Sequence, residues 1–206
     1  MNRAWSWAEI DSRALLHNLH RVRELAPRSK VAAVVKANAY GHGIELVTRV
    51  LAEKVDAFAV ATCAEGIQAR KQDSITPIWV LLGYGDEGEL KTCVSHHLTP
   101  VIASEHQLNL WTSAGIESMK VIIELDIGMG RMGFEIQESS HQLTKLESDD
   151  DRGRTLVLGH FPAAESSNFT EISEASRRFS NASRSAGRSL TLANSAANFS
   201  PSVYSS

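Results

Sequence analysis

The sequence has few cysteines and no excess of positive charge. Its two cysteines, Cys63 and Cys93, are too few and too far apart in the chain for a disulfide framework or a zinc-site spacing. The formal net charge is −3 and the Lys and Arg residues are scattered, so neither a nucleic acid nor an anionic membrane is expected as a partner. So few cysteines fit a reducing compartment, in which cysteine is mostly a small buried apolar residue.

The sequence also lacks long apolar runs. The N-terminus has no apolar core of a signal peptide, and no later run has the length of a membrane span. We therefore expect a cytoplasmic protein that does not interact with membranes. With 206 residues, of which 43% are hydrophobic, the chain is long enough for one sizeable core, and residues 1–206 are treated as one domain.

Short apolar runs alternate with amphipathic segments along most of the chain. The apolar runs predict strands, and the segments with helical spacing of apolar residues predict helices. Residues 7–10 alternate like a short strand, and Asp11 is a suitable N-cap for the first helix, which Pro27 ends. The barrel strands are predicted at 31–36, 57–61, 78–82, 98–102, 120–126, 155–158 and 189–192. The intervening helices are predicted at 44–53, 64–71, 87–96, 105–113, 140–146 and 172–185.

This alternation predicts βαβ units and a parallel sheet. Potentially reactive or turn-forming residues, including Lys36 and Gly83, directly follow strands, as they do at the carboxyl-end face of a (β/α)8 TIM-type barrel. Seven barrel strands are recognisable and an eighth is not, whereas a closed barrel usually needs about 250 residues, so we expect a barrel truncated after about seven strands. A doubly wound open sheet is the alternative, although no G-x-G-x-x-G motif opens its first helix.

The segment 34–43 places a lysine at the end of the first buried strand, before a glycine-containing turn with Tyr40 and His42. A lysine at this position directs its amine toward the mouth of the sheet, where α/β folds and barrels have their active sites. A partly desolvated amine can attack a carbonyl and form a Schiff base. Taken alone, a lysine at this position is more often a structural residue whose stem packs on the sheet while its charge reaches water.

Three further candidate groups follow later strands. Arg131 lies in a glycine-rich turn and can present a planar set of donors, although a lone arginine there could also be a surface residue. His160 could stack on a planar ligand or be a core histidine. Asn194 and Ser195 start a turn of small residues that could hold a phosphate at a helix N-terminus or could only cap that helix.

Together these motifs resemble one family. Val-Val-Lys-Ala-Asn-Ala-Tyr-Gly-His-Gly at 34–43, Gly-Met-Gly-Arg-Met-Gly at 128–133, His-Phe at 160–161 and Ala-Asn-Ser-Ala-Ala at 193–197 occur in the order found in alanine racemase. The Ala-Glu-Ile-Asp at 8–11 matches as well. The first motif is highly specific, and the resemblance spans nearly the whole chain.

The resemblance implies an isomerase that interconverts L-alanine and D-alanine and so supplies D-alanine for peptidoglycan. It implies pyridoxal 5′-phosphate (PLP) attached to Lys36 through a Schiff base, with Lys36 also acting as one of two bases that move the α-proton. It further implies a small amino-acid substrate and a homodimer of the full-length protein. No metal site is implied.

The same resemblance assigns roles to other residues. Tyr40 corresponds to a tyrosine that binds the phosphate of PLP. Arg131 is expected to donate to the phenolic oxygen of PLP, and His160 is expected to lie against the ring. Ser195, with the backbone near Asn194, is expected to hold the phosphate.

The chain departs from the family pattern at Glu124, where many members have a lysine carboxylated to a carbamate. A glutamate can supply the same negative charge, so we predict that Glu124 pairs with Arg131 and orients it. Gly159 also replaces a common threonine.

Other parts of the family pattern are absent from the sequence. These are an eighth strand with a phosphate loop, an arginine facing the pyridine nitrogen, and a β-rich C-terminal domain whose tyrosine is the second base across a dimer interface. We therefore expect a fragment of a longer protein that racemises alanine, and little or no activity from residues 1–206 alone. The alternatives are a non-catalytic PLP-homeostasis barrel, or a racemase for another amino acid such as serine.

Overall fold

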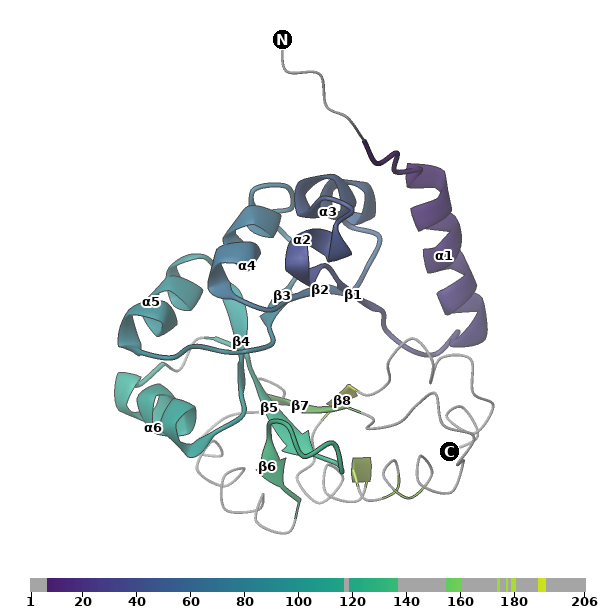
Figure 1. The fold of residues 1–206 in the computed structure, drawn as a ribbon. Helices are drawn as coiled ribbons and strands as arrows, with labels where there is room; N and C mark the ends of the chain where they lie inside the picture. The colour runs from purple at the N-terminus through teal and green to yellow at the C-terminus, as the bar shows by residue number, and fades with distance from the viewer. Residues whose placement is uncertain are drawn as a thin grey trace.

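The computed structural model describes residues 7–116, 119–136, 155–160, 174, 177, 179–180 and 189–191. In this part of the chain, parallel strands form a curved sheet with helices on its outer side (Figure 1). The strands are β1 (Ala32–Val34), β2 (Ala57–Val60), β3 (Ile78–Val80), β4 (Leu98–Ile102), β5 (Val121–Asp126), β6 (Phe134–Glu135), β7 (Thr155–Gly159) and β8 (Ser189–Thr191). The helices are α1 (Ser12–Leu25), α2 (Lys36–Tyr40), α3 (Ile44–Leu51), α4 (Cys63–Arg70), α5 (Glu87–Ser95) and α6 (Glu105–Ala114).

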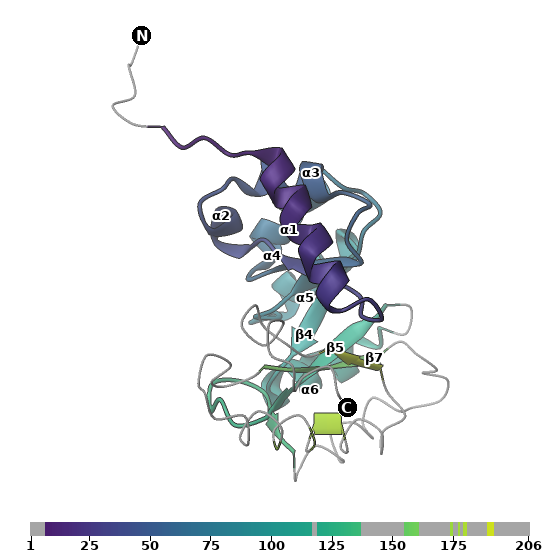
Figure 2. The same ribbon diagram turned by 90° about the vertical axis from the view of Figure 1, so that its right-hand side faces the viewer.

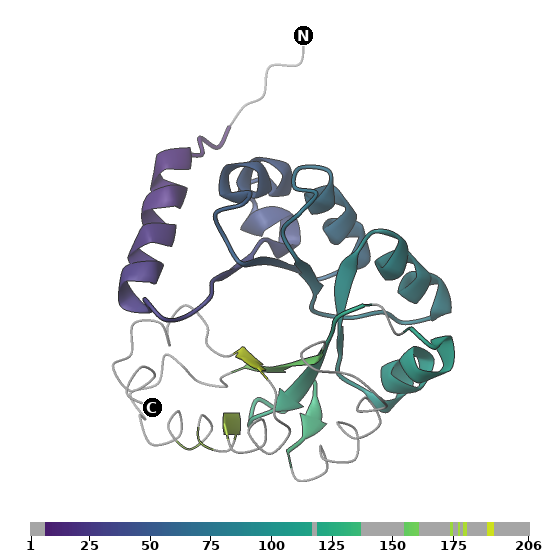
Figure 3. The ribbon, with the colours of Figure 1, turned by 180° about the vertical axis from the view of Figure 1, so that it is seen from behind.

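The order of the strands distinguishes a barrel from a doubly wound sheet. The order is β1-β2-β3-β4-β5-β7-β8, and the short β6 pairs with β5 beside this path. Every described strand pair is parallel. A doubly wound sheet reverses its winding direction at a switch point, whereas this order follows the chain without reversal, as in a barrel. Seen from behind in Figure 3, β8 continues the curve beside β7.

The central strands β2, β4 and β5 are strongly apolar and mostly buried. All four residues of β2 are buried, and Phe58 in that strand has no exposed surface. This is the pattern of a parallel strand between helices and a packed interior. One apolar cluster joins β1–β4 with α3 and α4, and the second joins β4, β5 and β7 with α5 and α6.

Three consecutive helices begin with the same local arrangement. In α4, α5 and α6 the N-cap side chain accepts a hydrogen bond from the backbone N–H of the third helical residue. This capping satisfies one of the N–H groups that a helix start leaves without a partner. The pairs are Thr62 with Glu65, Asp86 with Glu89, and Ser104 with Gln107.

Most elements match the sequence expectations. Asp11 caps α1 by accepting a hydrogen bond from the N–H of Arg13 at 2.8 Å, and all seven predicted barrel strands are present. The strand predicted at residues 7–10 was wrong, because these residues form no strand and pair with none of the described strands. β6 was not predicted, since two residues carry no periodicity. The helix predicted at 140–146 lies outside the described residues.

Cys63 in α4 and Cys93 in α5 are free and buried, and their thiols are in direct contact. The sequence spacing gave no sign of this contact, which the packing of neighbouring helices creates.

In Figure 2, α1 lies along the outside of the molecule near α3, with which it packs. No helix among the described residues is long and apolar enough to span a membrane.

Candidate active site

Lys36 follows β1 and begins the segment labelled α2, whose backbone conformation is not that of a regular α-helix. Ala37, Asn38, Ala39 and Tyr40 all have φ between 51° and 55°, which is the left-handed region. Each non-glycine residue in this region costs about 1–2 kcal/mol, so surrounding contacts must hold the turn.

Hydrogen bonds to neighbouring segments hold this turn. The Asn38 side chain accepts from the N–H of Ile44 at 2.9 Å and so caps the start of α3. The Glu65 carboxylate accepts from the N–H of Ala37 at 2.7 Å. Gly41 ends the turn with φ 87°, a value that glycine tolerates without strain. The backbone next to Lys36 is therefore restrained from α3 and from α4.

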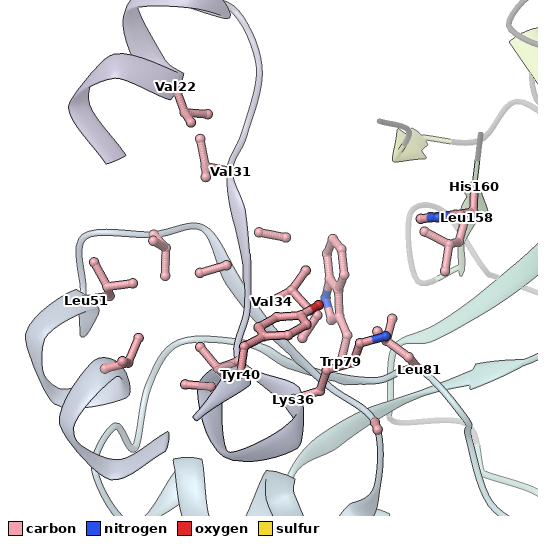
Figure 4. Close-up of a pocket in the computed structure, with 18 of the residues that line it drawn as sticks. Val22, Val31, Val34, Lys36, Tyr40, Leu51, Trp79, Leu81, Leu158 and His160 are labelled. Carbon is pink, nitrogen blue, oxygen red and sulfur yellow. The ribbon is translucent and has the colours of Figure 1, made fainter. Parts of the chain in front are cut away.

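A cavity of about 830 Å³ extends from the carboxyl ends of the strands along β1 to α1. Its lining includes five of the predicted site residues. In Figure 4 the side chains of Lys36 and Tyr40 lie near Trp79 and Leu81, and His160 lies on the other side of the space. The five predicted residues in the lining are Lys36, Tyr40, Glu124, Arg131 and His160. Asn194 and Ser195 lie outside the described residues, so their predicted roles stay predictions.

Sequence reasoning missed Trp79 and Leu81 as lining residues. They lie on or just after β3, in an apolar run that predicts only a buried strand. Alternation along that strand was the available signal, since Ile78 and Val80 are fully buried while Trp79 is only partly buried. Leu15, Leu19 and Val22 of α1 also line the cavity, whose wall is thus largely apolar.

The turn that carries Arg131 is fixed by Asp126 at the end of β5. The Asp126 carboxylate accepts hydrogen bonds from the N–H groups of Gly128 and Gly130, both at 2.9 Å for the closer oxygen. Gly133 has φ 103°, and a Cβ there would lie 2.8 Å from the backbone nitrogen of Asp126. Glycine is therefore needed for the close approach of this turn to β5.

The structure places Glu124 and Arg131, which are expected to pair, at one cavity. Both side chains line the cavity, and Glu124 is 6% exposed. The ion pairs within 4.0 Å among the described residues do not include one between these two side chains. Burial nevertheless raises the pKa of Glu124, while the positive charge of Arg131 opposes that increase. Glu124 and Arg131 thus affect each other through their charges, and the pairing that would orient Arg131 stays a prediction.

The pKa of His160 also depends on burial and on nearby positive charge. Burial lowers the pKa of His160, and the charges of Arg131 and Lys36 lower it further. The imidazole is therefore neutral at pH values where a free histidine begins to take up a proton.

The raised pKa of Glu124 predicts a pH-dependent contribution to stability. In the unfolded chain this carboxyl ionises near 4.5, whereas in the folded chain it holds its proton to higher pH. The folded state therefore loses stability as the pH rises from that value through the folded pKa. We expect Glu124→Gln to gain stability relative to the wild type over this range. Thermal unfolding of both proteins across pH measures the difference, and a pH-independent difference would contradict the assignment.

Comparison with known proteins identifies the family. Residues 10–205 match the family described as "Alanine racemase, N-terminal domain". The chain belongs to the alanine racemase family. It is 35% identical over 191 residues to the alanine racemase of Shewanella piezotolerans, covering 92% of this chain and 53% of that protein. It is 38% identical over 160 residues to the biosynthetic alanine racemase of Escherichia coli, covering 76% of this chain and 44% of that protein.

The fold agrees with this assignment. The crystal structure of the biosynthetic alanine racemase from Pseudomonas aeruginosa superimposes with a TM-score of 0.87 at 29% identity, covering 94% of this chain and 55% of that one. The chain thus has the α/β fold of the alanine racemase N-terminal barrel and spans about half the length of the relatives it matches. This family binds PLP.

Proposed function

We propose that this chain is the PLP-binding barrel of an enzyme that interconverts L-alanine and D-alanine, with Lys36 as the residue that holds PLP. The observation that carries the proposal is the position of Lys36 at the end of β1. It shares an apolar-walled cavity with Arg131 and His160, within the fold of this family. Among the residues described as lining the cavity, Lys36 is the only lysine.

The residues of the cavity fit PLP in charge and in shape. PLP is planar, anionic and carries an aldehyde, and Lys36 offers a primary amine for covalent attachment. Trp79 and Leu81 contribute apolar surface for the ring, and Arg131 and Lys36 contribute positive charge. The neutral His160 can pack against a ring without adding a charge. Tyr40, which is 60% exposed, leaves its hydroxyl available for the phosphate.

The chain's own residues then carry the following roles. When bound, PLP withdraws electrons from the substrate and makes its α-hydrogen acidic. The amine of Lys36 would accept or return the proton at the α-carbon of the substrate on one face. Arg131 would donate to the phenolic oxygen of PLP, and the nearby charge of Glu124 would help to orient it. The apolar wall would keep water from the reacting carbon.

Racemisation tests the proposal. Protein expressed from the whole reading frame that contains residues 1–206 should form D-alanine from L-alanine. Residues 1–206 alone should show little or no turnover. Appreciable turnover by residues 1–206 would contradict the second expectation. PLP attachment without racemisation by the extended protein would instead favour a PLP-homeostasis barrel, and racemisation of serine in preference to alanine would change the substrate.

A further inference from the structure

A single carboxylate joins the ends of two neighbouring strands beside Lys36. One oxygen of Glu65 accepts from the N–H of Ala37, directly after Lys36, at 2.7 Å. Its other oxygen accepts from the N–H of Ala61, just after β2, at 2.7 Å, and from that of Thr62 at 3.4 Å. Glu65 is not among the residues that line the cavity. Its effect on the site must therefore act through the backbone of β1 and β2.

The neighbouring helices α5 and α6 have a simpler form of this hydrogen-bonding arrangement. In each helix, the side chain of the third helical residue also accepts a hydrogen bond from the N–H of the residue before the N-cap. Glu89 accepts from Gly85 at 2.7 Å in α5, and Gln107 accepts from Ala103 at 2.8 Å in α6. Gln107 shows that an amide oxygen is sufficient for this reach-back bond. Its amide nitrogen donates to the carbonyls of Leu82 and Tyr84.

Glu65 differs because its second oxygen also meets a donor. A glutamine at this position could keep the bond to Ala61 through its single oxygen. Its NH₂ group would then face the N–H of Ala37, and two donors cannot hydrogen-bond to each other. A carboxylate is thus needed to make both bonds at once. The two donors at Ala61 and Thr62 favour the orientation in which a glutamine oxygen stays with them and the N–H of Ala37 loses its acceptor. The bond to Ala37 anchors the first residue of the left-handed turn, whose conformation is costly without restraint.

We propose that Glu65 is a positioning residue for Lys36. By holding the N–H of Ala37, it fixes the backbone from which the Lys36 side chain enters the cavity, and so sets the approach of the amine to a carbonyl ligand. This inference rests on the proposed function, in which Lys36 binds PLP. It predicts that Glu65 affects the attachment of PLP without contacting it.

The test compares Glu65→Gln with Glu89→Gln, which removes the same charge at the same helical position. PLP attachment is measured by absorbance titration and by borohydride trapping at Lys36. Loss of a charge-assisted hydrogen bond predicts that Glu65→Gln weakens attachment by about tenfold or more. Glu89→Gln should change attachment by less than about twofold, since the amide of Gln107 supports the same bond in α6.

Amide hydrogen exchange supplies a second readout without PLP. In Glu65→Gln the N–H of Ala37 should lose protection while that of Ala61 keeps it. Equal PLP attachment by Glu65→Gln and the wild type, or unchanged protection of Ala37, would overturn the inference. If Glu65→Gln does not fold, Glu65→Asp, which keeps the charge but shortens the reach, is measured in the same way. Failure of both variants to fold would assign Glu65 a role in folding alone and overturn the inference.

Failure of the proposed function is recognised separately. If wild-type protein is not labelled at Lys36, the proposed function is wrong whatever the behaviour of Glu65. If wild-type protein is labelled and Glu65→Gln is labelled equally well, only the role of Glu65 is wrong.

Discussion

Replacing Lys36 with alanine should abolish the borohydride-stable attachment of PLP to this protein. The physical reason is that only a primary amine can form the reducible bond, and Lys36 is the only lysine among the described residues that line the cavity. Lys36→Arg should fail in the same way, because it keeps the positive charge but has no nucleophilic amine. The measurement is reduction in the presence of PLP, followed by mass spectrometry of the peptides.

The matched control for this experiment is Lys91→Ala. Lys91 lies on α5, pairs with Glu87 at 2.7 Å and is not among the cavity residues. Its removal should leave the label at Lys36 unchanged. Label at another lysine in the wild type, or label that persists in Lys36→Ala at the wild-type level, would refute the assignment of Lys36.

The largest loss of stability should follow from Gly83→Ala. Gly83 lies after β3 with φ 65°, and a Cβ there would lie 2.2 Å from the carbonyl oxygen of Val101 in β4. It would also lie 2.7 Å from the side-chain nitrogen of Gln107, which bonds to the carbonyls on both sides of Gly83. Backbone strain and overlap together should lower the free energy of unfolding by about 2–4 kcal/mol. Urea unfolding measures this change.

The variant Gly115→Ala measures the stability cost of backbone strain without steric overlap. Gly115 ends α6 with φ 59°, close to the value at Gly83, but an added Cβ would meet no atom within 4 Å. This variant should therefore lose only the backbone contribution, about 1 kcal/mol. Equal losses in the two variants would show that the contact with Val101 relaxes freely and would contradict the expected overlap.

The arrangement of helices and strands was largely predictable from the sequence. Parallel βαβ units have strong local signals, such as the apolar run before Lys36 and the N-cap at Asp11, and these elements formed where expected. The strand prediction at residues 7–10 was wrong because alternation of apolar and polar residues alone cannot show whether a partner strand is available. The two-residue β6 gave no signal, since its pairing with β5 depends on the tight turn at Gly133.

The candidate site was predictable to a similar degree. Lys36, Glu124, Arg131 and His160 line one cavity because the ends of parallel strands meet at one face. Glu65 was missed because its partner Ala37 is 28 residues away, and a glutamate near a helix start is normally only a cap. The left-handed turn was missed because Ala37 and Ala39 have no residue preference for that conformation.

The division of the core into two clusters has a consequence for synthesis on the ribosome. The cluster around β1–β4 consists of residues no later in the chain than Leu98, including Phe58 and Val80. All of its residues can therefore come into contact before β5 and β7 have been made, because synthesis proceeds from the N-terminus. Lys36 and its restrained turn would then be in place on a nascent chain before Glu124, Arg131 and His160 emerge.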